Sequence, residues 1–204
     1  MAVEARSGWI TAAALVLGCS GASPPPAAAT TKAAASGVAR YLPLEDGTVF
    51  SYETTTEPAG ERGLLVLEVR RPRADAATLV VAGRATPLSV GAHAVAHAAG
   101  GFFLSEPLVV GAEWHGDFGH VRVTRVGARV TVPAGTFDDC VETVEELSVR
   151  EGAKRTTTTF CAGVGITSRA TEVEQDGEHQ SERIALKSFG KRFDPSSAAT
   201  TNSR

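Results

Sequence analysis

Short apolar or β-branched runs, separated by glycine, proline and polar turn residues, follow one another through most of the chain. Such runs are typical of β-strands, and no segment shows the sustained periodicity of a long amphipathic helix. The pattern predicts strands over residues 49–56, 63–70, 77–82, 92–98, 102–104, 120–126, 129–132, 154–160, 165–173 and 178–189.

Turn residues refine this pattern. Gly127 predicts a hairpin between residues 120–126 and 129–132, and Asp176-Gly177 is a stronger hairpin signal between the last two strands. Residues 140–149 fit either a helical or a strand face, and we favour a strand because Glu151-Gly152 is typical of a hairpin turn. Successive strands without intervening helices predict an all-β fold, a single antiparallel curled sheet that forms a half-barrel or barrel of about ten strands.

An internal repeat marks two of the expected turns. Residues 43–50 (PLEDGTVF) and 107–114 (PLVVGAEW) share the pattern P-L-x-x-G-x-x-aromatic. Proline ends a preceding strand, glycine supplies the turn, and the aromatic residue, Phe50 or Trp114, enters the core as the next strand begins. The alternative is two unrelated turns of similar composition. In either case the pattern concerns folding rather than chemistry.

The N-terminus has the features of an export signal. Residues 9–18 form an apolar run too short to span a bilayer, and Val16-Leu17-Gly18-Cys19 resembles the lipobox of bacterial lipoproteins. The resemblance implies cleavage before Cys19, lipidation of its thiol and attachment to a membrane through the lipid. By resemblance to lipoproteins of diderm bacteria, Ser20, which is not an aspartate, favours the outer membrane, facing the periplasm or the exterior. The alternative is a plain secretory signal with an accidental cysteine.

Composition divides the chain into four segments. We expect a signal peptide at 1–18, a lipidated cysteine and Ala/Pro-rich tether at 19–37, a β-rich globular domain at 38–193 and a disordered tail at 194–204. The net charge is −3 and the basic residues are scattered, so nothing indicates a nucleic-acid partner.

Two strings resemble a group of uncharacterised bacterial lipoproteins. The first is residues 41–52 (YLPLEDGTVFSY), and the second is residues 132–140 (VPAGTFDDC), followed by the G-V-G string at 163–165. The resemblance implies an all-β envelope domain and carries no activity with it. Cys161 departs from the pattern, because such proteins commonly have another residue there. Physically, VPAGTF is also what a strand, a Pro-Gly turn and a core aromatic residue would need.

Cys140 and Cys161 are the cysteines that remain beyond the anchor, and export places them in an oxidising compartment. If residues 150 and 153 pair across the hairpin, the two cysteines are diagonal neighbours on one sheet face. That geometry is slightly long for a disulfide unless a bulge shifts the register. We expect a disulfide, and two buried thiols are the alternative.

Histidines are the remaining candidates for chemistry. His93 and His97 share one strand face, and His115 and His120 flank Asp117, but neither spacing matches a standard metal site. We therefore expect solvent-facing histidines, no metal and no cofactor. The chain has no G-x-S-x-G or H-E-x-x-H motif, and adjacent Asp138 and Asp139 on a strand would point to opposite faces, so we expect no catalytic residue and no enzyme.

Three functions remain. The first is a non-catalytic, lipid-anchored envelope protein that holds a lipid or another apolar ligand on its curled sheet, an idea that rests on fold analogy. The second is a structural or accessory envelope protein that acts through protein contacts. An enzyme or metal protein is the least favoured. An apolar cavity on the concave face would support the first, and a filled core the second.

Overall fold

The computed structural model describes residues 37–149 and 152–192. The predicted signal peptide, the tether up to residue 36 and the tail lie outside these ranges. The described residues form one short helix, α1 (Val38–Tyr41), and twelve strands. The strands are β1 (Thr48–Glu57), β2 (Glu61–Arg73), β3 (Ala76–Val81), β4 (Arg84–Val90), β5 (Ala94–His97), β6 (Phe102–Ser105), β7 (Glu113–His115), β8 (His120–Val132), β9 (Gly135–Val149), β10 (Gly152–Cys161), β11 (Gly165–Gln175) and β12 (Glu178–Lys191).

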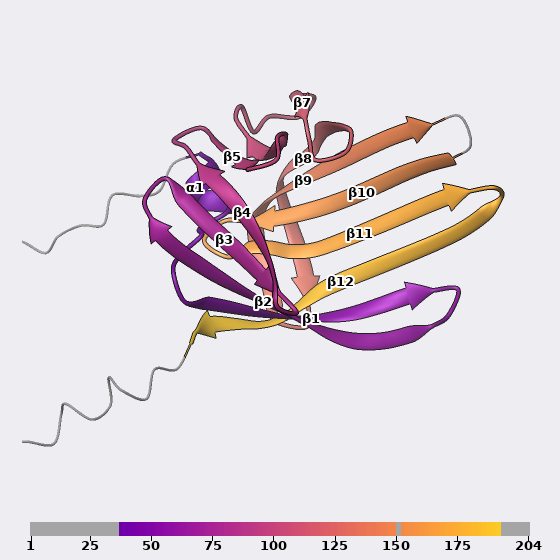
Figure 1. Ribbon diagram of the computed structural model, residues 1–204, viewed down its shortest axis with the longest axis horizontal. Coiled ribbons are helices and arrows are strands. Elements are labelled where there is room, and N and C mark those ends of the chain that lie inside the picture. Colours follow the sequence, from indigo (N-terminus) through magenta and orange to yellow (C-terminus); the bar gives the residue numbers. More distant parts are fainter. Residues whose placement is uncertain (1–36, 150–151, 193–204) are drawn as a thin grey trace, which may run out of the picture. The chain divides into compact units, whose positions relative to one another are not determined.

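All twelve strands belong to one antiparallel sheet in the order β6-β5-β4-β3-β2-β1-β12-β11-β10-β9-β8-β7. Strands adjacent in the chain pair with one another throughout, except that β1 pairs with β12 and β6 does not pair with β7. The sheet bends sharply, so that β2, β3 and β4 cross the direction of β9 to β12 (Figure 1). This bend brings the two edge strands, β6 and β7, toward each other.

The two edge strands, β6 and β7, are joined by a side-chain hydrogen bond and not by a ladder of backbone hydrogen bonds. The indole N–H of Trp114 in β7 donates a hydrogen bond of 3.1 Å to the carbonyl oxygen of Phe102 in β6. The sheet is therefore a nearly closed barrel with a seam between β6 and β7.

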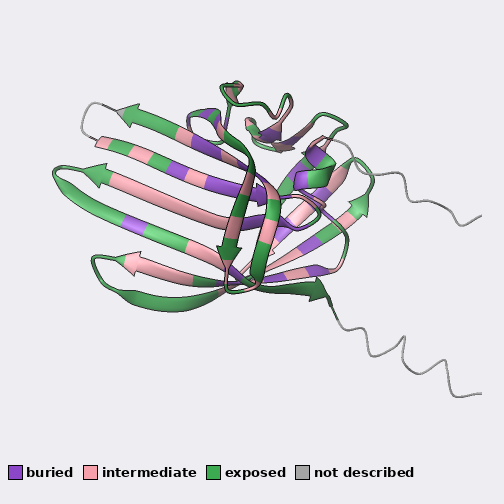
Figure 2. Cartoon of the chain, turned by 180° about the vertical axis from the view of Figure 1, so that it is seen from behind, coloured by how far each residue is buried: buried purple, intermediate pink, exposed green. Residues whose placement is uncertain are grey.

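The core lies toward the end of the sheet that carries α1. Val38 and Tyr41 of the helix are buried, and Gly163 donates its N–H to the carbonyl of Arg40, which fixes the helix against the β10–β11 turn. Buried positions concentrate at this end, whereas the far ends of the long hairpins are largely exposed (Figure 2). The interior is therefore packed with buried side chains at the α1 end and less filled toward the ends of the long hairpins.

The predicted fold class is confirmed, with twelve strands where about ten were expected. The pattern missed β4 and gave only the aromatic residue of β7. The strand at 140–149 is confirmed, and so is the Asp176-Gly177 hairpin, whose two residues have φ of 52° and 79°. The hairpin at Gly127 is wrong. β8 runs through it as one strand with register shifts, because a glycine with φ of 72° is accommodated in a bulge as readily as in a turn.

Each of the two repeat copies makes an equivalent backbone hydrogen bond. Gly47 donates to the carbonyl of Val69 and Gly111 to that of Val123, each at 2.9 Å, and both glycines have positive φ. Phe50 enters the core as expected, with 6% of its surface exposed. Trp114 differs, because it is only half-buried and closes the seam. The first copy also follows a helix rather than a strand.

Candidate functional site

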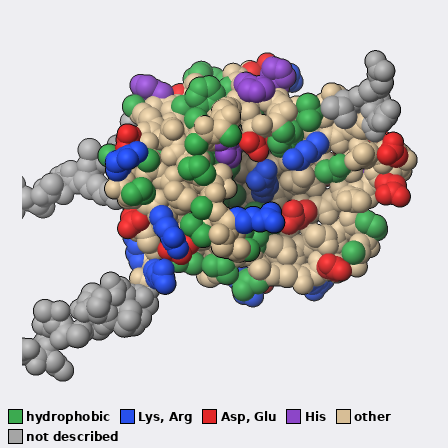
Figure 3. All heavy atoms as spheres, viewed as in Figure 1, with side chains coloured by type: hydrophobic (Ala, Val, Ile, Leu, Met, Phe, Trp, Pro, Cys, Tyr) green, Lys and Arg blue, Asp and Glu red, His purple; other side chains and the backbone are tan. Residues whose placement is uncertain are grey.

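A cavity of about 620 Å³ lies inside the curled sheet. Pockets that hold one small ligand are typically about 300–1,000 Å³. The space is bounded by residues from β1 to β4, from the β5–β6 region and from β10 to β12. Figure 3 shows a hollow on the viewed face with basic, acidic and histidine side chains around it.

One wall of the cavity is apolar. Alternate residues of β1, β2 and β3 point inward and form it: Tyr52, Leu65, Leu67, Leu79 and Val81. The Tyr52 hydroxyl donates to the carbonyl of Ile166 at 3.0 Å, and burial raises the pKa of Tyr52, so the phenol stays neutral. This wall presents aliphatic and aromatic surface with no charge.

The opposite wall, on β10 and β11, is rich in threonine. Thr156 and Thr171 face each other across the two strands with their hydroxyl oxygens 3.1 Å apart. One step deeper, Thr158 lies opposite Arg169, and beyond them Phe160 lies opposite Ile166 at the apolar floor. The interior is therefore amphipathic, with a polar wall above an apolar floor.

Arg169 is the unusual member of this wall. Its Nε is closed to solvent and has no hydrogen-bond partner in the described part of the chain. The side chain lines both the main cavity and a small adjoining one of about 50 Å³. A buried donor without an acceptor costs roughly 1–3 kcal/mol, so the unpaired Nε lowers the stability of the folded state.

Other charged groups lie nearer the opening. The Lys154 ammonium sits 3.9 Å from the centre of the Phe118 ring, and the residue is half-buried. Asp117 and Glu182 line the same cavity but are exposed to solvent. Neither carboxylate comes within ion-pair distance of Arg169. Arg169 thus has its Nε closed to solvent, whereas the two carboxylates of the cavity are exposed.

The histidines are spread over the molecule. His93 bonds Glu106 at 2.7 Å, and the rings of His115 and His120 meet edge to face at 6.0 Å. The expectation of solvent-facing histidines is wrong for His97, which lines the cavity with its ring against Phe103. The inward face of β5 carries Val95 and His97, so its alanines point outward instead. Within residues 37–149 and 152–192, no three His, Cys, Asp or Glu side chains are grouped as a metal site would require.

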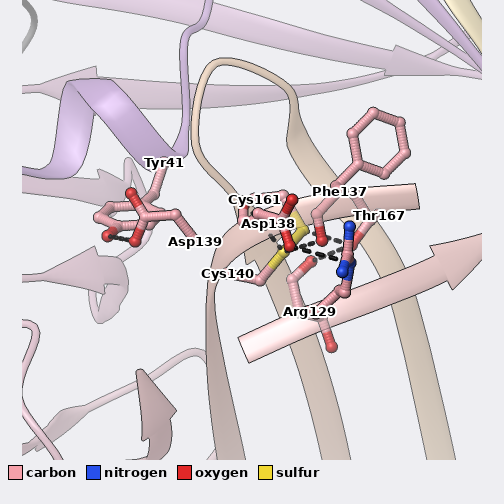
Figure 4. Close-up of a disulfide and its surroundings, with 9 residues drawn as sticks. Tyr41, Arg129, Phe137, Asp138, Asp139, Cys140, Cys161 and Thr167 are labelled. Carbon is pink, nitrogen blue, oxygen red and sulfur yellow. Dashed lines mark hydrogen bonds and ion pairs between the residues drawn. A yellow bond between two sulfur atoms is a disulfide. The ribbon is translucent and has the colours of Figure 1, made fainter. Parts of the chain in front are cut away.

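Cys140 and Cys161 form a disulfide (Figure 4). The predicted register is wrong, because Val149 pairs with Gly152 and the cysteines lie directly opposite each other, 4.0 Å apart at Cα. The expected diagonal relationship assumed that residues 150 and 153 pair. The disulfide joins β9 and β10 beneath the apolar floor and is fully buried.

Asp138 and Asp139 both belong to β9, and their carboxylates contact different elements of the chain. Asp138 pairs with Arg129 at 3.0 Å. Asp139 accepts hydrogen bonds from Tyr41 at 2.8 Å and from Arg40 (Figure 4). Both carboxylates therefore fasten structural elements, and Asp139 holds α1 to the sheet.

The sequence pattern did not single out Arg169 or Lys154. Strict alternation from the inward Ile166 would place Ser168 inside and Arg169 outside. A register shift between Thr159 and Phe160 on β10 inserts one extra residue in β11 and reverses this phase. The one available signal was the density of threonines in residues 156–159, which marked a polar inner face.

Cys19, the predicted lipidation site, lies outside the described residues. In the described part of the chain, no helix has the length and apolar character needed to cross a membrane.

No protein-family model matches the chain, and no curated protein matches its sequence. The chain is similar to a solved structure from Bacteroides fragilis, a protein inferred to be exported and described as having a YmcC-like fold. The TM-score is 0.49 at 12% identity, covering 74% of this chain and 99% of that one. It is also similar to an inferred lipoprotein from Parabacteroides distasonis, with a TM-score of 0.44 at 14% identity, covering 74% of this chain and 98% of that one.

Proposed function

We propose that this chain is a non-catalytic, lipid-anchored protein of the cell envelope that holds one apolar ligand inside its curled sheet. The observation that carries the proposal is the cavity of about 620 Å³ with an uncharged wall of Tyr52, Leu65, Leu67, Leu79 and Val81. A sheet that had only to fold would fill this volume, because protein interiors are packed to crystal-like density.

Membrane attachment through Cys19 and placement at the outer membrane remain part of the proposal. They are supported by the apolar run at 9–18 and the Leu-Gly-Cys string. Kinship with the lipoproteins that share the VPAGTF signature is also part of the proposal, and it rests on residues 41–52 and 132–140. Such a protein would keep a ligand soluble near the membrane surface.

The test is binding of straight-chain alcohols of increasing length to the full chain. Each buried methylene contributes about 0.8 kcal/mol, so two more carbons should tighten Kd by roughly tenfold until the cavity is filled. Isothermal titration calorimetry measures this directly.

A pair of neighbouring valines on β3 supplies the control. Val81 lines the cavity, whereas Val80 faces the outer side of the sheet, and both are half-buried. Val81→Phe should weaken alcohol binding, and Val80→Phe should leave it unchanged. If no alcohol binds, the ligand-holding function is wrong and the protein-contact alternative stands.

A further inference from the structure

We propose that the ligand is an amphiphile whose anionic head group, a carboxylate or a phosphate, pairs with the Arg169 guanidinium while its apolar tail lies against the wall formed by β1 to β3. This inference rests on the proposed function and adds the class of ligand.

Arg169 lies next to the apolar end of the cavity. Arg169 lies opposite Thr158, one register step above the apolar floor of Phe160 and Ile166. The Arg169 side chain lines the cavity, and its Nε is closed to solvent.

Arg169 also lacks a compensating partner among the described residues. Charged groups inside proteins are normally paired, because burial without a partner is costly. In the described part of the chain, the Arg169 side chain has neither a hydrogen bond nor an ion pair, and its Nε is closed to solvent. An anion bound in the cavity would supply the missing partner, and a guanidinium is suited to grip a carboxylate or phosphate with two parallel hydrogen bonds.

A second cation, Lys154, lines the same wall of the cavity. Lys154 lies on the same face of β10 as Thr158 and is also half-buried, whereas the two carboxylates of the cavity, Asp117 and Glu182, are exposed. Exposed carboxylates are screened by water and salt, whereas the Arg169 Nε is closed to solvent. The described residues of β10 and β11 line the cavity with Arg169 and Lys154 and with no carboxylate, although Asp117 and Glu145 line the small adjoining cavity together with Arg169. A head group on this wall would meet the two cations, and its tail would meet the uncharged wall opposite.

The experiment compares four ligands with one dodecyl chain and different heads: dodecanol, dodecanoate, dodecyl phosphate and dodecyltrimethylammonium. Binding to the full chain is measured by calorimetry below micelle-forming concentrations. The carboxylate or the phosphate should bind about 10- to 100-fold more tightly than dodecanol, as expected for a charge-assisted hydrogen bond. The cation should bind more weakly than dodecanol. Whichever anion binds more tightly identifies the head group.

Variants locate the effect. Arg169→Gln should abolish the preference for an anionic head and leave dodecanol binding unchanged, which also shows that the cavity is intact. Arg169→Lys should restore part of the preference. The matched control is Arg183→Gln, which removes an exposed cation from the outer face of β12.

Equal binding of dodecanol and both anions by the wild type would overturn the inference and leave the apolar cavity standing. Binding of acetate or inorganic phosphate alone with the same affinity would overturn the role of the tail. Failure of every dodecyl ligand, dodecanol included, would instead contradict the proposed function itself.

Discussion

The backbone of Gly101 passes so close to Gly116 that a β-carbon built on Gly101 would lie 1.9 Å from the Gly116 carbonyl oxygen. These residues flank β6 and β7, so this contact lies at the seam that Trp114 bridges. Because the neighbour is backbone, it cannot rotate away. The seam therefore closes in this way only where position 101 lacks a side chain.

Substituting Gly101 should therefore open the seam. Gly101 has φ of 78° and Gly83 has φ of 79°, but a β-carbon on Gly83 would meet nothing within 4 Å. Gly83→Ala should cost about 1–2 kcal/mol from the left-handed backbone alone. Gly101→Ala should cost about 1–3 kcal/mol more and speed amide hydrogen exchange in β6 and β7. Equal unfolding free energies for the two variants would show that the seam tolerates a methyl group.

The disulfide should stabilise the barrel through the unfolded state. Cys140 and Cys161 are separated by 21 positions, and closing a loop of this length contributes about 3 kcal/mol in the chain-entropy model. The double variant Cys140→Ala/Cys161→Ala should lose about this much in urea unfolding. Reductant should lower the midpoint of the wild type and leave the variant unaffected. Identical midpoints for the wild type with and without reductant would contradict the linkage.

Glu142 should make stability depend on pH. Arg125 holds this carboxylate with bonds of 2.6 and 3.2 Å and Thr124 adds one of 2.8 Å, and the hydrogen bonds from Arg125 lower the pKa of Glu142. The unfolded chain takes up the proton more readily, so the stabilisation is present above the ordinary pKa of about 4.3 and is lost as pH falls below it.

Glu142→Gln should consequently reduce the unfolding free energy at pH 7 by about 1–2 kcal/mol, and the difference from wild type should shrink below about pH 4. Glu178→Gln, at an exposed position on β12, is the control and should show no such convergence. A Glu142→Gln deficit that stays constant from pH 7 to pH 3 would mean that its cause is packing rather than charge.

Lipid attachment is tested at Cys19. Because the thiol is the acceptor in the proposed modification, Cys19→Ser should abolish labelling by radioactive palmitate and release the chain from the membrane fraction. Cys19 is the cysteine outside the disulfide, so Cys140→Ala/Cys161→Ala should leave labelling intact. Continued labelling of Cys19→Ser would exclude the lipobox assignment.

Local signals predicted the fold class because most strands, β4 and β7 excepted, combine an apolar or β-branched run with a turn. Asp176-Gly177 gave its hairpin correctly, since both residues need positive φ and only one kind of turn uses that pair. Gly127 also has positive φ, but a bulge needs the same conformation, so the residue alone could not distinguish a turn from a continuous strand.

The site was harder to predict because its location depends on register. One extra residue near Thr167 decides that Arg169 faces the cavity, and a shift of the β9–β10 turn decides that the cysteines face each other. Each shift changes which side chains meet while leaving the hydrophobic pattern almost unaltered. Long-range closure, here the pairing of β1 with β12 that joins the two halves of the sheet, leaves no local trace at all.

The central claim is that the cavity holds an apolar ligand in the cell envelope. Its most direct test is lipid mass spectrometry of the full chain purified from membranes. The wild type is compared with Val81→Phe and Val80→Phe, and only lipids that are not covalently attached to the protein are counted. The account predicts a non-covalent, single-chain lipid in the wild type and in Val80→Phe, strongly depleted in Val81→Phe. The same lipid content in all three proteins, or none in any of them, would contradict it.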